Sequence, residues 1–329
     1  MKYGIILGSP TLAELLQTAI RAEAAGFESV WTTEFFNSHG LVRLGAVAGV
    51  TDRVKLGTAI SYIFMRSPML AASAAMDIDE LSGGRMILGL GSGTKRMNED
   101  WYSMSFDGAP APRFEDAIGL IRAAFAAQHG GGLHYSGPHY SVKIPLYSRP
   151  NAAREQIPVC LAAVNKGMIR AAARTGDGLI GHPVFTRDWI KNTVNPALQG
   201  SKCKLYPYVM TSIADSTEQA RAEAKAQIGF YYTTRLYHSI LEPLGWVGHG
   251  ENCANAFRRG DFKGVVDAVT DEMVDAIAIT GTPDAVRDQL KQWDGLADEV
   301  ILYPPSIGIA PGRVQENLDA MIDTFASRM

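Results

Sequence analysis

The sequence predicts a single α/β domain, a (β/α)8 barrel of the TIM type that spans residues 1–329. Short apolar runs alternate with segments of helical periodicity from the first residues onward, which is typical of βαβ units and a parallel sheet. Eight such runs occur, and no shift in composition divides the chain into two domains. With 329 residues, of which 47% are hydrophobic, the chain is long enough to bury one large core.

The eight predicted strands are short apolar runs, the pattern of parallel strands that are buried on both faces. They are expected at residues 3–8, 28–33, 53–60, 85–90, 158–163, 177–181, 205–213 and 299–303. Helical periodicity separates them, at residues 12–20, 40–51, 67–81, 113–127, 166–175, 187–199 and 314–325. Further helices are expected to begin at Ser216, which Gln219 follows in a capping pattern, and at Thr282, where Pro283 suits the first turn.

Two long segments interrupt this alternation, one after the fourth strand and one after the seventh. Residues 129–157 contain three consecutive glycines and several prolines, and we interpret them as a hairpin or lid outside the barrel. Residues 229–270 are rich in tyrosine, histidine and tryptophan. Aromatic insertions of this kind cover a pocket or bury a subunit interface, and the sequence favours neither reading.

The composition excludes several classes of function. The formal net charge is only −3, and no block of basic residues indicates nucleic acid or an anionic membrane as a partner. The first apolar run is too short for a signal peptide and no long apolar stretch follows, so we expect a cytoplasmic protein. Cys160, Cys203 and Cys253 are far apart and suit reduced thiols, so neither a disulfide framework nor a metal site is expected.

Residues 81–94, where a helix end leads into the fourth strand, give the clearest indication of a binding site. Gly89, Gly91 and Gly93 remove every second side chain as this strand ends, so a flat ring or a phosphate could approach the backbone. The spacing is G-x-G-x-G and no helical period follows before about residue 113, which argues against a dinucleotide fingerprint. The alternative is that these glycines only allow helices to pack closely on the strand.

In a barrel of this kind the active site lies at the carboxyl ends of the strands. The residues expected there carry few charges and no motif for metal or hydrolytic chemistry, a pattern that favours a large, flat, mostly apolar ligand. Asn165, Lys166 and Gly167 open the helix after the fifth strand, where free N–H groups and the helix dipole form a site for a phosphate. An ordinary helix cap by Asn165 explains the same pattern.

Glu34 and His182 are the candidate catalytic residues. Glu34 is the one acid at a predicted strand end, and burial by aromatic neighbours would let it hold a proton near neutrality and act as an acid. These aromatic neighbours are Trp31, Phe35 and Phe36. Glu34 could equally form an ion pair with Arg43 or Arg66. His182 lies where the sixth strand ends, but a lone histidine is more often a structural residue that is hydrogen-bonded.

Several segments resemble the luciferase-like monooxygenase superfamily, and they occur in the order seen in that family. They are residues 25–34 (AGFESVWTTE), 56–60 (LGTAI) with 66–68 (RSP), 81–85 (LSGGR) with 88–93 (LGLGSG), and 176–178 (GDG). Within the superfamily, residues 31–37 and 94–101 look most like actinobacterial oxidoreductases that use the deazaflavin coenzyme F420.

The resemblance implies a homodimeric barrel that holds a (deaza)flavin across the strand ends, with its phosphate near the helix after the fifth strand. It also implies a non-proline cis peptide after the third strand, which here is Ala59-Ile60. The residues expected to bind the cofactor are Thr58, Ala59, Ile60, Gly91, Ser92, Gly93, Thr94, Asn98, Ala162, Ala163, Val164, Asn165, Lys166 and Gly167. Many deazaflavin members have Asp-His after the second strand, where this chain has Glu34-Phe35, so the family's histidine is not carried over.

We therefore expect an oxidoreductase that transfers a hydride between coenzyme F420 and a small organic substrate. A monooxygenase that uses FMN and O2 is the alternative, because the same fold permits a pocket for an oxygen adduct. A third reading is a cofactor-poor binding protein of the same fold. Such a protein would have lost the fourth-strand glycines and the anion site, and this chain has kept both.

Overall fold

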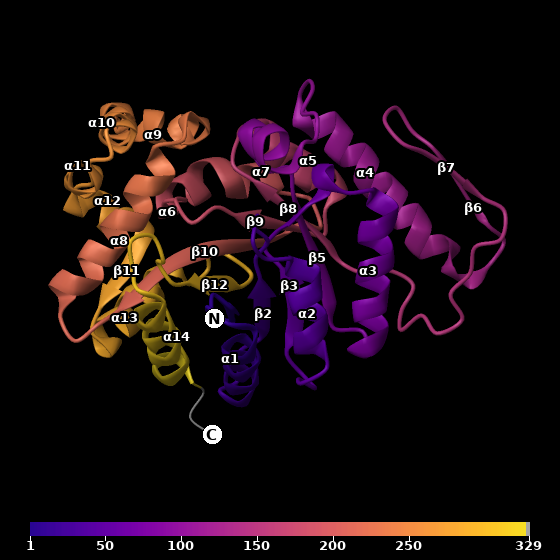
Figure 1. Cartoon of the computed structure of the whole chain (residues 1–329), viewed down its shortest axis with the longest axis horizontal. Coiled ribbons are helices and arrows are strands. Elements are labelled where there is room, and N and C mark those ends of the chain that lie inside the picture. Colours follow the sequence, from indigo (N-terminus) through magenta and orange to yellow (C-terminus); the bar gives the residue numbers. More distant parts are fainter. Residues whose placement is uncertain (327–329) are drawn as a thin grey trace.

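Eight parallel strands form a closed barrel in the computed structural model, which describes residues 1–326 (Figure 1). Around the barrel they follow the order β1 (Tyr3–Ile6), β2 (Ser29–Thr32), β3 (Lys55–Thr58), β5 (Met86–Gly91), β8 (Val159–Ala163), β9 (Gly178–Gly181), β10 (Lys204–Ile213) and β12 (Val300–Tyr303). Pairing of β12 with β1 closes the ring. The predicted (β/α)8 barrel is confirmed, and each predicted strand overlaps an observed one.

Four short strands lie outside this ring. β4 (Ser61–Tyr62) pairs with β5 beyond the end of β3, and β11 (Ala278–Gly281) pairs with β10. β6 (Leu133–Ser136) and β7 (Ser141–Ile144) form an antiparallel hairpin that projects from the body of the molecule (Figure 1). The sequence does not predict β11, because this strand follows helix α12 (Asp271–Ile277) directly, without turn residues to mark it.

Helices cover the outside of the barrel (Figure 1). They are α1 (Leu12–Ala24), α2 (Gly40–Ala48), α3 (Pro68–Leu81), α4 (Pro110–Ala126), α5 (Lys166–Thr175), α6 (Arg187–Trp189), α7 (Asn195–Leu198), α8 (Thr217–Tyr232), α13 (Pro283–Leu290) and α14 (Pro311–Phe325). Side-chain caps fix where several of them begin. The N–H of Gln219 donates to the Ser216 hydroxyl at 3.1 Å, so Ser216 caps α8 as the sequence predicts.

The segment between α8 and β11 forms a group of short helices, of which α12 is the last. It contains α9 (His238–Leu241), α10 (Val247–Arg258) and α11 (Phe262–Asp267), which gather beside the carboxyl-terminal half of α8 (Figure 1). Tyr232, Trp246 and Cys253 are buried within it. Part of the aromatic content of this segment therefore belongs to the large hydrophobic core rather than to a surface for a ligand or a second subunit.

The interior of the barrel is filled by side chains that point inward from the strands. They are Ile6, Trp31, Ala59, Ile87, Cys160, Ile180, Tyr206, Tyr208 and Ile301. A larger core lies between the strands and the helices. Burial raises the pKa of the Cys160 thiol well above its usual value, so this cysteine is an unreactive core residue, as expected.

The pairing of β5 with the chain of β3 and β4 shifts by one residue between the two strands. Residues 58–60 therefore face only residues 88–89, which is a bulge of one extra residue. We call residues 58–60 the bulge. It contains the cis peptide Ala59–Ile60 that the resemblance implies.

Gly89 and Thr58 make room for the bulge. The Thr58 hydroxyl donates to the carbonyl oxygen of Gly89 at 2.7 Å and accepts from the Gly89 N–H at 3.0 Å. The side chain thus replaces ladder hydrogen bonds that the bulge removes. A Cβ atom at position 89 would lie only 1.8 Å from the carbonyl oxygen of Thr58, so no larger residue fits unless the bulge moves.

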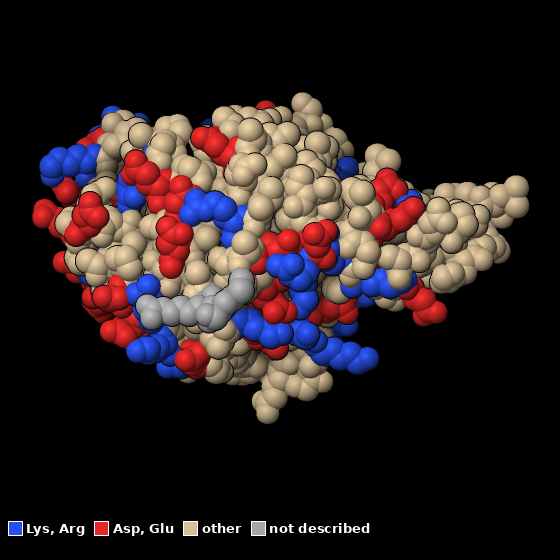
Figure 2. All heavy atoms as spheres, turned by 90° about the horizontal axis from the view of Figure 1, so that it is seen from below, with Lys and Arg blue, Asp and Glu red and all other residues tan. Residues whose placement is uncertain are grey.

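The surface carries charges of both signs in mixed order. Figure 2 shows lysine and arginine side chains interspersed with aspartate and glutamate over one face. This distribution agrees with the formal net charge of −3. Across residues 1–326, no helix has the length and apolar character needed to cross a membrane.

We predict that Gly89→Ala lowers the free energy of unfolding by about 1–3 kcal/mol, because the added methyl group collides with the backbone of the bulge. Gly248→Ala in α10 is the matched control, since no atom lies within 4 Å of a Cβ atom built there. Alanine at this exposed helical position should leave stability unchanged or raise it by up to about 1 kcal/mol. Urea unfolding measures both values, and equal stability of the two variants would contradict the role of Gly89.

Candidate active site at the barrel mouth

The carboxyl ends of the eight strands meet at one opening of the barrel, which we call the mouth. The structure brings all the predicted site residues to segments that end at or follow β2, β3, β5, β8 and β9 there. Those that keep partial or full exposure are Ile60, Ser92, Gly93, Thr94, Ala162, Val164, Asn165, Lys166, Gly167 and His182. Those that are buried are Glu34, Thr58, Ala59, Gly91, Asn98 and Ala163. Their binding of a cofactor stays a prediction.

Glu34 forms an ion pair with Arg66, which follows β4 and a short 3-10 turn. The Nη2 group of Arg66 donates to Oε1 of Glu34, and the two side chains are only 13% and 4% exposed, respectively. The sequence leaves Arg43 and Arg66 as possible partners of Glu34, and Arg66 is the one that forms the ion pair. The contact is the ion pair that the sequence left open beside a catalytic role for Glu34, and the catalytic role stays a prediction.

The aromatic residues expected to bury Glu34 lie elsewhere, which corrects that interpretation. Phe35 and Phe36 are 39% and 62% exposed, and their rings contact Trp101 at centroid distances of 5.2 and 5.6 Å. Trp31 points into the barrel, where its ring lies 5.7 Å from Tyr206. β2 ends at Thr32, so the alternation of a strand does not determine where the side chains of residues 34–36 point.

Five buried polar atoms around this ion pair have no hydrogen-bond partner within residues 1–326. They are Oε2 of Glu34, Nη1 of Arg66, the hydroxyl groups of Ser61 and Tyr102, and Oδ1 of Asn98. Burial raises the pKa of the Tyr102 hydroxyl and the charge of Glu34 adds to the rise, which places this tyrosine beside the ion pair. An unpaired buried polar atom costs about 1–3 kcal/mol, so such a group of atoms indicates a binding function.

Asn98 holds the loop after β5 in place. Its Nδ2 group donates to the carbonyl oxygens of Ser92 and Thr94, both at 2.9 Å. Gly93 has a φ of +66°, and a Cβ atom there would lie 3.2 Å from Nδ2 of Asn98. Asn98 lies in a π-helical turn at Met97–Trp101, whereas the sequence predicts no helical structure before residue 113. A single turn of five residues is too short to show an apolar period.

The glycines of β5 contact the bulge rather than leave open space. A Cβ atom at Gly91 would lie 1.7 Å from Cδ1 of Ile60, so the Ile60 side chain covers this glycine. A Cβ atom at Gly89 would in the same way overlap the carbonyl oxygen of Thr58. Close packing therefore explains both glycines, although the partner is the neighbouring strand and not a helix. Thr58 is fully buried, and its hydroxyl makes hydrogen bonds to both backbone groups of Gly89. It therefore holds the bulge in place and is not itself exposed at the site.

The start of α5 combines the two roles that the sequence left open. Oδ1 of Asn165 accepts from the N–H of Met168 at 3.0 Å, which is an ordinary helix cap. The N–H groups of Lys166 and Gly167 lie in the first turn, where a helix offers them no acceptor of its own, and they stay free to bind an anion. Lys166 is exposed and adds a positive charge at the same place.

His182 lies on the opposite side of the mouth from Glu34, among tyrosines. Its ring centroid is 4.8 Å from that of Tyr231 and 4.3 Å from that of Tyr237. Both tyrosines belong to the segment after β10, so part of that aromatic insertion does cover the mouth. Burial lowers the pKa of His182 to about 3, which makes this residue a neutral group at physiological pH.

A chain of tyrosines connects His182 to the bulge. The hydroxyl groups of Tyr231 and Tyr303 lie 2.8 Å apart, and the Tyr303 ring lies 5.4 Å from that of Tyr208. The Tyr208 hydroxyl donates to the carbonyl oxygen of Ala59. Tyr208 is not among the site residues predicted from the sequence, although alternation along β10 places it on the inward face together with Tyr206.

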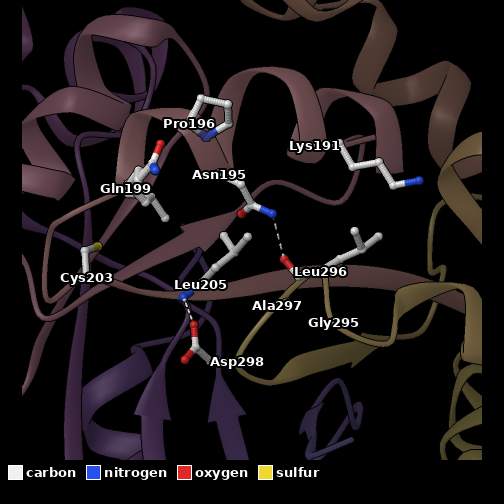
Figure 3. A pocket seen from close by; sticks show the side chains of 11 residues that line it. Lys191, Asn195, Pro196, Gln199, Cys203, Leu205, Gly295, Leu296, Ala297 and Asp298 are labelled. Carbon is white, nitrogen blue, oxygen red and sulfur yellow. Dashed lines mark hydrogen bonds between the residues drawn. The ribbon is translucent and has the colours of Figure 1, made fainter.

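The cavity shown in Figure 3 lies at the other end of the barrel and has a volume of about 600 Å³. It opens near the amino ends of β10 and β12, beside α7. Two of its polar groups are already paired: the Leu205 N–H donates to Oδ2 of Asp298 at 2.8 Å, and Nδ2 of Asn195 donates to the Leu296 carbonyl at 3.2 Å. The unpaired polar atoms at the mouth make the mouth the better candidate.

Comparison with known proteins gives one family. A sequence model of the luciferase-like monooxygenase family matches residues 3–299. The uncharacterized protein Rv1360 of Mycobacterium tuberculosis is 31% identical over 307 residues, which cover 88% of this chain and 89% of that protein. A 5,10-methylenetetrahydromethanopterin reductase of Archaeoglobus fulgidus is 28% identical over 311 residues, with 89% and 90% covered.

Solved structures show the same fold. The coenzyme F420 dependent tetrahydromethanopterin reductase from Methanopyrus kandleri superposes with a TM-score of 0.78 at 22% identity, over 98% of this chain and 99% of that one. The oxygenating constituent of 3,6-diketocamphane monooxygenase of Pseudomonas putida, solved with FMN, gives a TM-score of 0.66 at 15% identity, over 99% and 98%.

We predict that Glu34→Gln and Arg66→Met each lower the free energy of unfolding by about 3–5 kcal/mol, because each leaves the partner's charge buried and unpaired. The double variant should lose much less than the sum of the two. A double-mutant cycle by urea unfolding measures this coupling. Lys263→Met, which breaks an exposed ion pair with Asp267, is the control and should change stability little. Single variants as stable as the parent would refute the coupling.

Proposed function

Because the chain belongs to the luciferase-like monooxygenase family, we propose that it is an oxidoreductase that transfers a hydride between coenzyme F420 and a small organic substrate. The observation that carries this proposal is the group of unpaired buried polar atoms around Glu34 and Arg66, beside the bulge at the mouth. The name of the Methanopyrus structure, a coenzyme F420 dependent reductase, supports the choice of cofactor.

The residues at the mouth fit a deazaflavin in three respects. The imide edge of such a ring offers N–H and carbonyl groups, and Oε2 of Glu34, Nη1 of Arg66 and the Ser61 hydroxyl are complementary acceptor and donors. Ile60 presents an apolar side chain that suits a flat ring. The free N–H groups at the start of α5, together with Lys166, suit the cofactor phosphate. When bound, the deazaflavin supplies delivery or acceptance of a hydride.

The ion pair gives Glu34 a binding role in this proposal. Paired with Arg66, its carboxylate has one oxygen occupied and the other free to accept a hydrogen bond from a ligand N–H. Asn98 stabilises the loop after β5, which borders the same space, and its free Oδ1 is a second acceptor. The proton needed for reduction of the substrate then comes from another group or from water. The homodimer and the small organic substrate stay predictions.

We predict that the purified protein binds coenzyme F420 at least tenfold more tightly than FMN. Fluorescence quenching measures both dissociation constants under the same conditions. Tighter binding of FMN would favour the monooxygenase that uses O2. Absence of binding to either would favour a binding protein of the same fold.

We predict that Gly167→Pro weakens cofactor binding about tenfold, because proline removes one of the N–H groups offered to the phosphate. Proline is tolerated in the first turn of a helix, so the fold should persist. Gly167→Ala is the matched control, since it keeps the N–H, and it should bind like the parent protein. Equal affinity of the folded proline variant would remove α5 from the phosphate site.

A further inference from the structure

His182 has one ring nitrogen committed to the backbone. The N–H of Val184 donates to Nδ1 of His182 at 3.3 Å. A nitrogen that accepts a hydrogen bond carries no proton, so the neutral ring must carry its proton on Nε2. The structure thus defines the tautomer as well as the position of this side chain.

The surroundings keep the ring neutral and orient it. Tyr231 from α8 and Tyr237 from the turn after α8 contact it, and neither carries a charge near neutral pH. Burial raises the pKa of the Tyr237 hydroxyl, and burial lowers the pKa of His182 itself to about 3. The residue as a whole is nevertheless only partly buried, and Nε2 is not among the buried atoms that lack a partner. It is therefore a hydrogen-bond donor that does not change its charge in the physiological range.

A chain of tyrosines links His182 to the bulge. The hydrogen-bonded hydroxyls of Tyr231 and Tyr303 and the contact of Tyr303 with Tyr208 lead from it to the carbonyl oxygen of Ala59. Glu34 and Arg66 lie beside the bulge on the side of β2, whereas His182 follows β9. A ligand held at the bulge would have charged groups on one side and a neutral donor on the other.

We propose that His182 donates a hydrogen bond from Nε2 to an oxygen atom on the reacting carbon of the substrate, and that the substrates are therefore carbonyl compounds. This inference rests on the proposed function, since it concerns the acceptor of the hydride. A neutral imidazole suits this task, because it stabilises negative charge that develops on oxygen without first having to lose or gain a proton.

The electron and proton balance of the step is simple. As the carbonyl carbon gains a hydride from the reduced deazaflavin of the proposed function, the π-electron pair of the C–O bond moves to oxygen. The oxygen then takes a proton from water, which gives an alcohol. His182 donates its hydrogen bond throughout and is neutral before and after the reaction.

The first test needs no cofactor. Protein labelled with 15N-histidine is examined by long-range 1H–15N NMR between about pH 5 and pH 9, and the His182 signals are identified from their loss in His182→Gln. We expect a neutral ring with its proton on Nε2 over the whole range. A ring that titrates within it, or a proton on Nδ1, overturns the inference.

The second test uses substrates. Reduced F420 is mixed with a panel of small aldehydes and ketones and, separately, activated alkenes, and kcat and KM are measured for each. His182→Leu should lower kcat for carbonyl compounds by about 100-fold, whereas His182→Gln, which keeps an N–H donor, should stay within about tenfold of the parent. Cofactor affinity should be unchanged in both. His134→Gln, on the exposed hairpin β6–β7, is the matched control with parental kinetics.

These outcomes separate the two proposals. If the protein does not bind F420, the proposed function fails whatever the NMR result. If it binds and oxidises reduced F420 but only with alkenes, or if His182→Leu turns over carbonyl compounds like the parent, the role of His182 fails and the proposed function stands.

Discussion

The site depends on one steric constraint, the close approach of the bulge to Gly89. Because no side chain occupies position 89, the carbonyl of Thr58 can lie against β5, and the Thr58 hydroxyl satisfies the two backbone groups that lose their partners. The extra residue shifts the register by one, so Ile60 covers Gly91 and β4 resumes the pairing. The chain then leads through a 3-10 turn to Arg66, opposite Glu34. A change at Gly89 would thus reach the ion pair as well as the barrel.

The mouth is electrostatically divided. On one side Glu34 and Arg66 bring a buried charge of each sign, whose net charge is zero but whose free Oε2 and Nη1 atoms keep donor and acceptor capacity. On the other side, His182 lies among tyrosines, where desolvation removes its charge. Buried ion pairs contribute little net stability compared with apolar side chains, so retention of this pair is better explained by recognition of a polar ring edge. The neutral side suits an uncharged reacting group.

The fold could be predicted from the sequence, but only part of the site could. The strands were predictable because parallel strands buried on both faces are continuous apolar runs, and the cis peptide followed from the family resemblance. β11 was missed because four residues after a helix carry no turn signal. The choice of Arg66 over Arg43 as partner of Glu34 depends on the course of the chain after the bulge, which residue types do not reveal. The outward direction of Phe35 likewise depends on Trp101, which lies far away in the sequence.

The two ends of the barrel differ in how their polar groups are paired. The size of a cavity is therefore a poor guide to the functional site here. At the amino end, Ser29 donates to the buried carboxyl of Glu299, and burial raises the pKa of that carboxyl. Two groups that border the cavity beside α7, the Leu205 N–H and the Asn195 side-chain amide, likewise have partners within the protein. At the mouth, by contrast, the free Oε2, Nη1 and Oδ1 atoms carry a desolvation cost that a polar ligand would remove. Unmet hydrogen-bonding capacity, rather than volume, therefore distinguishes the functional end of this barrel.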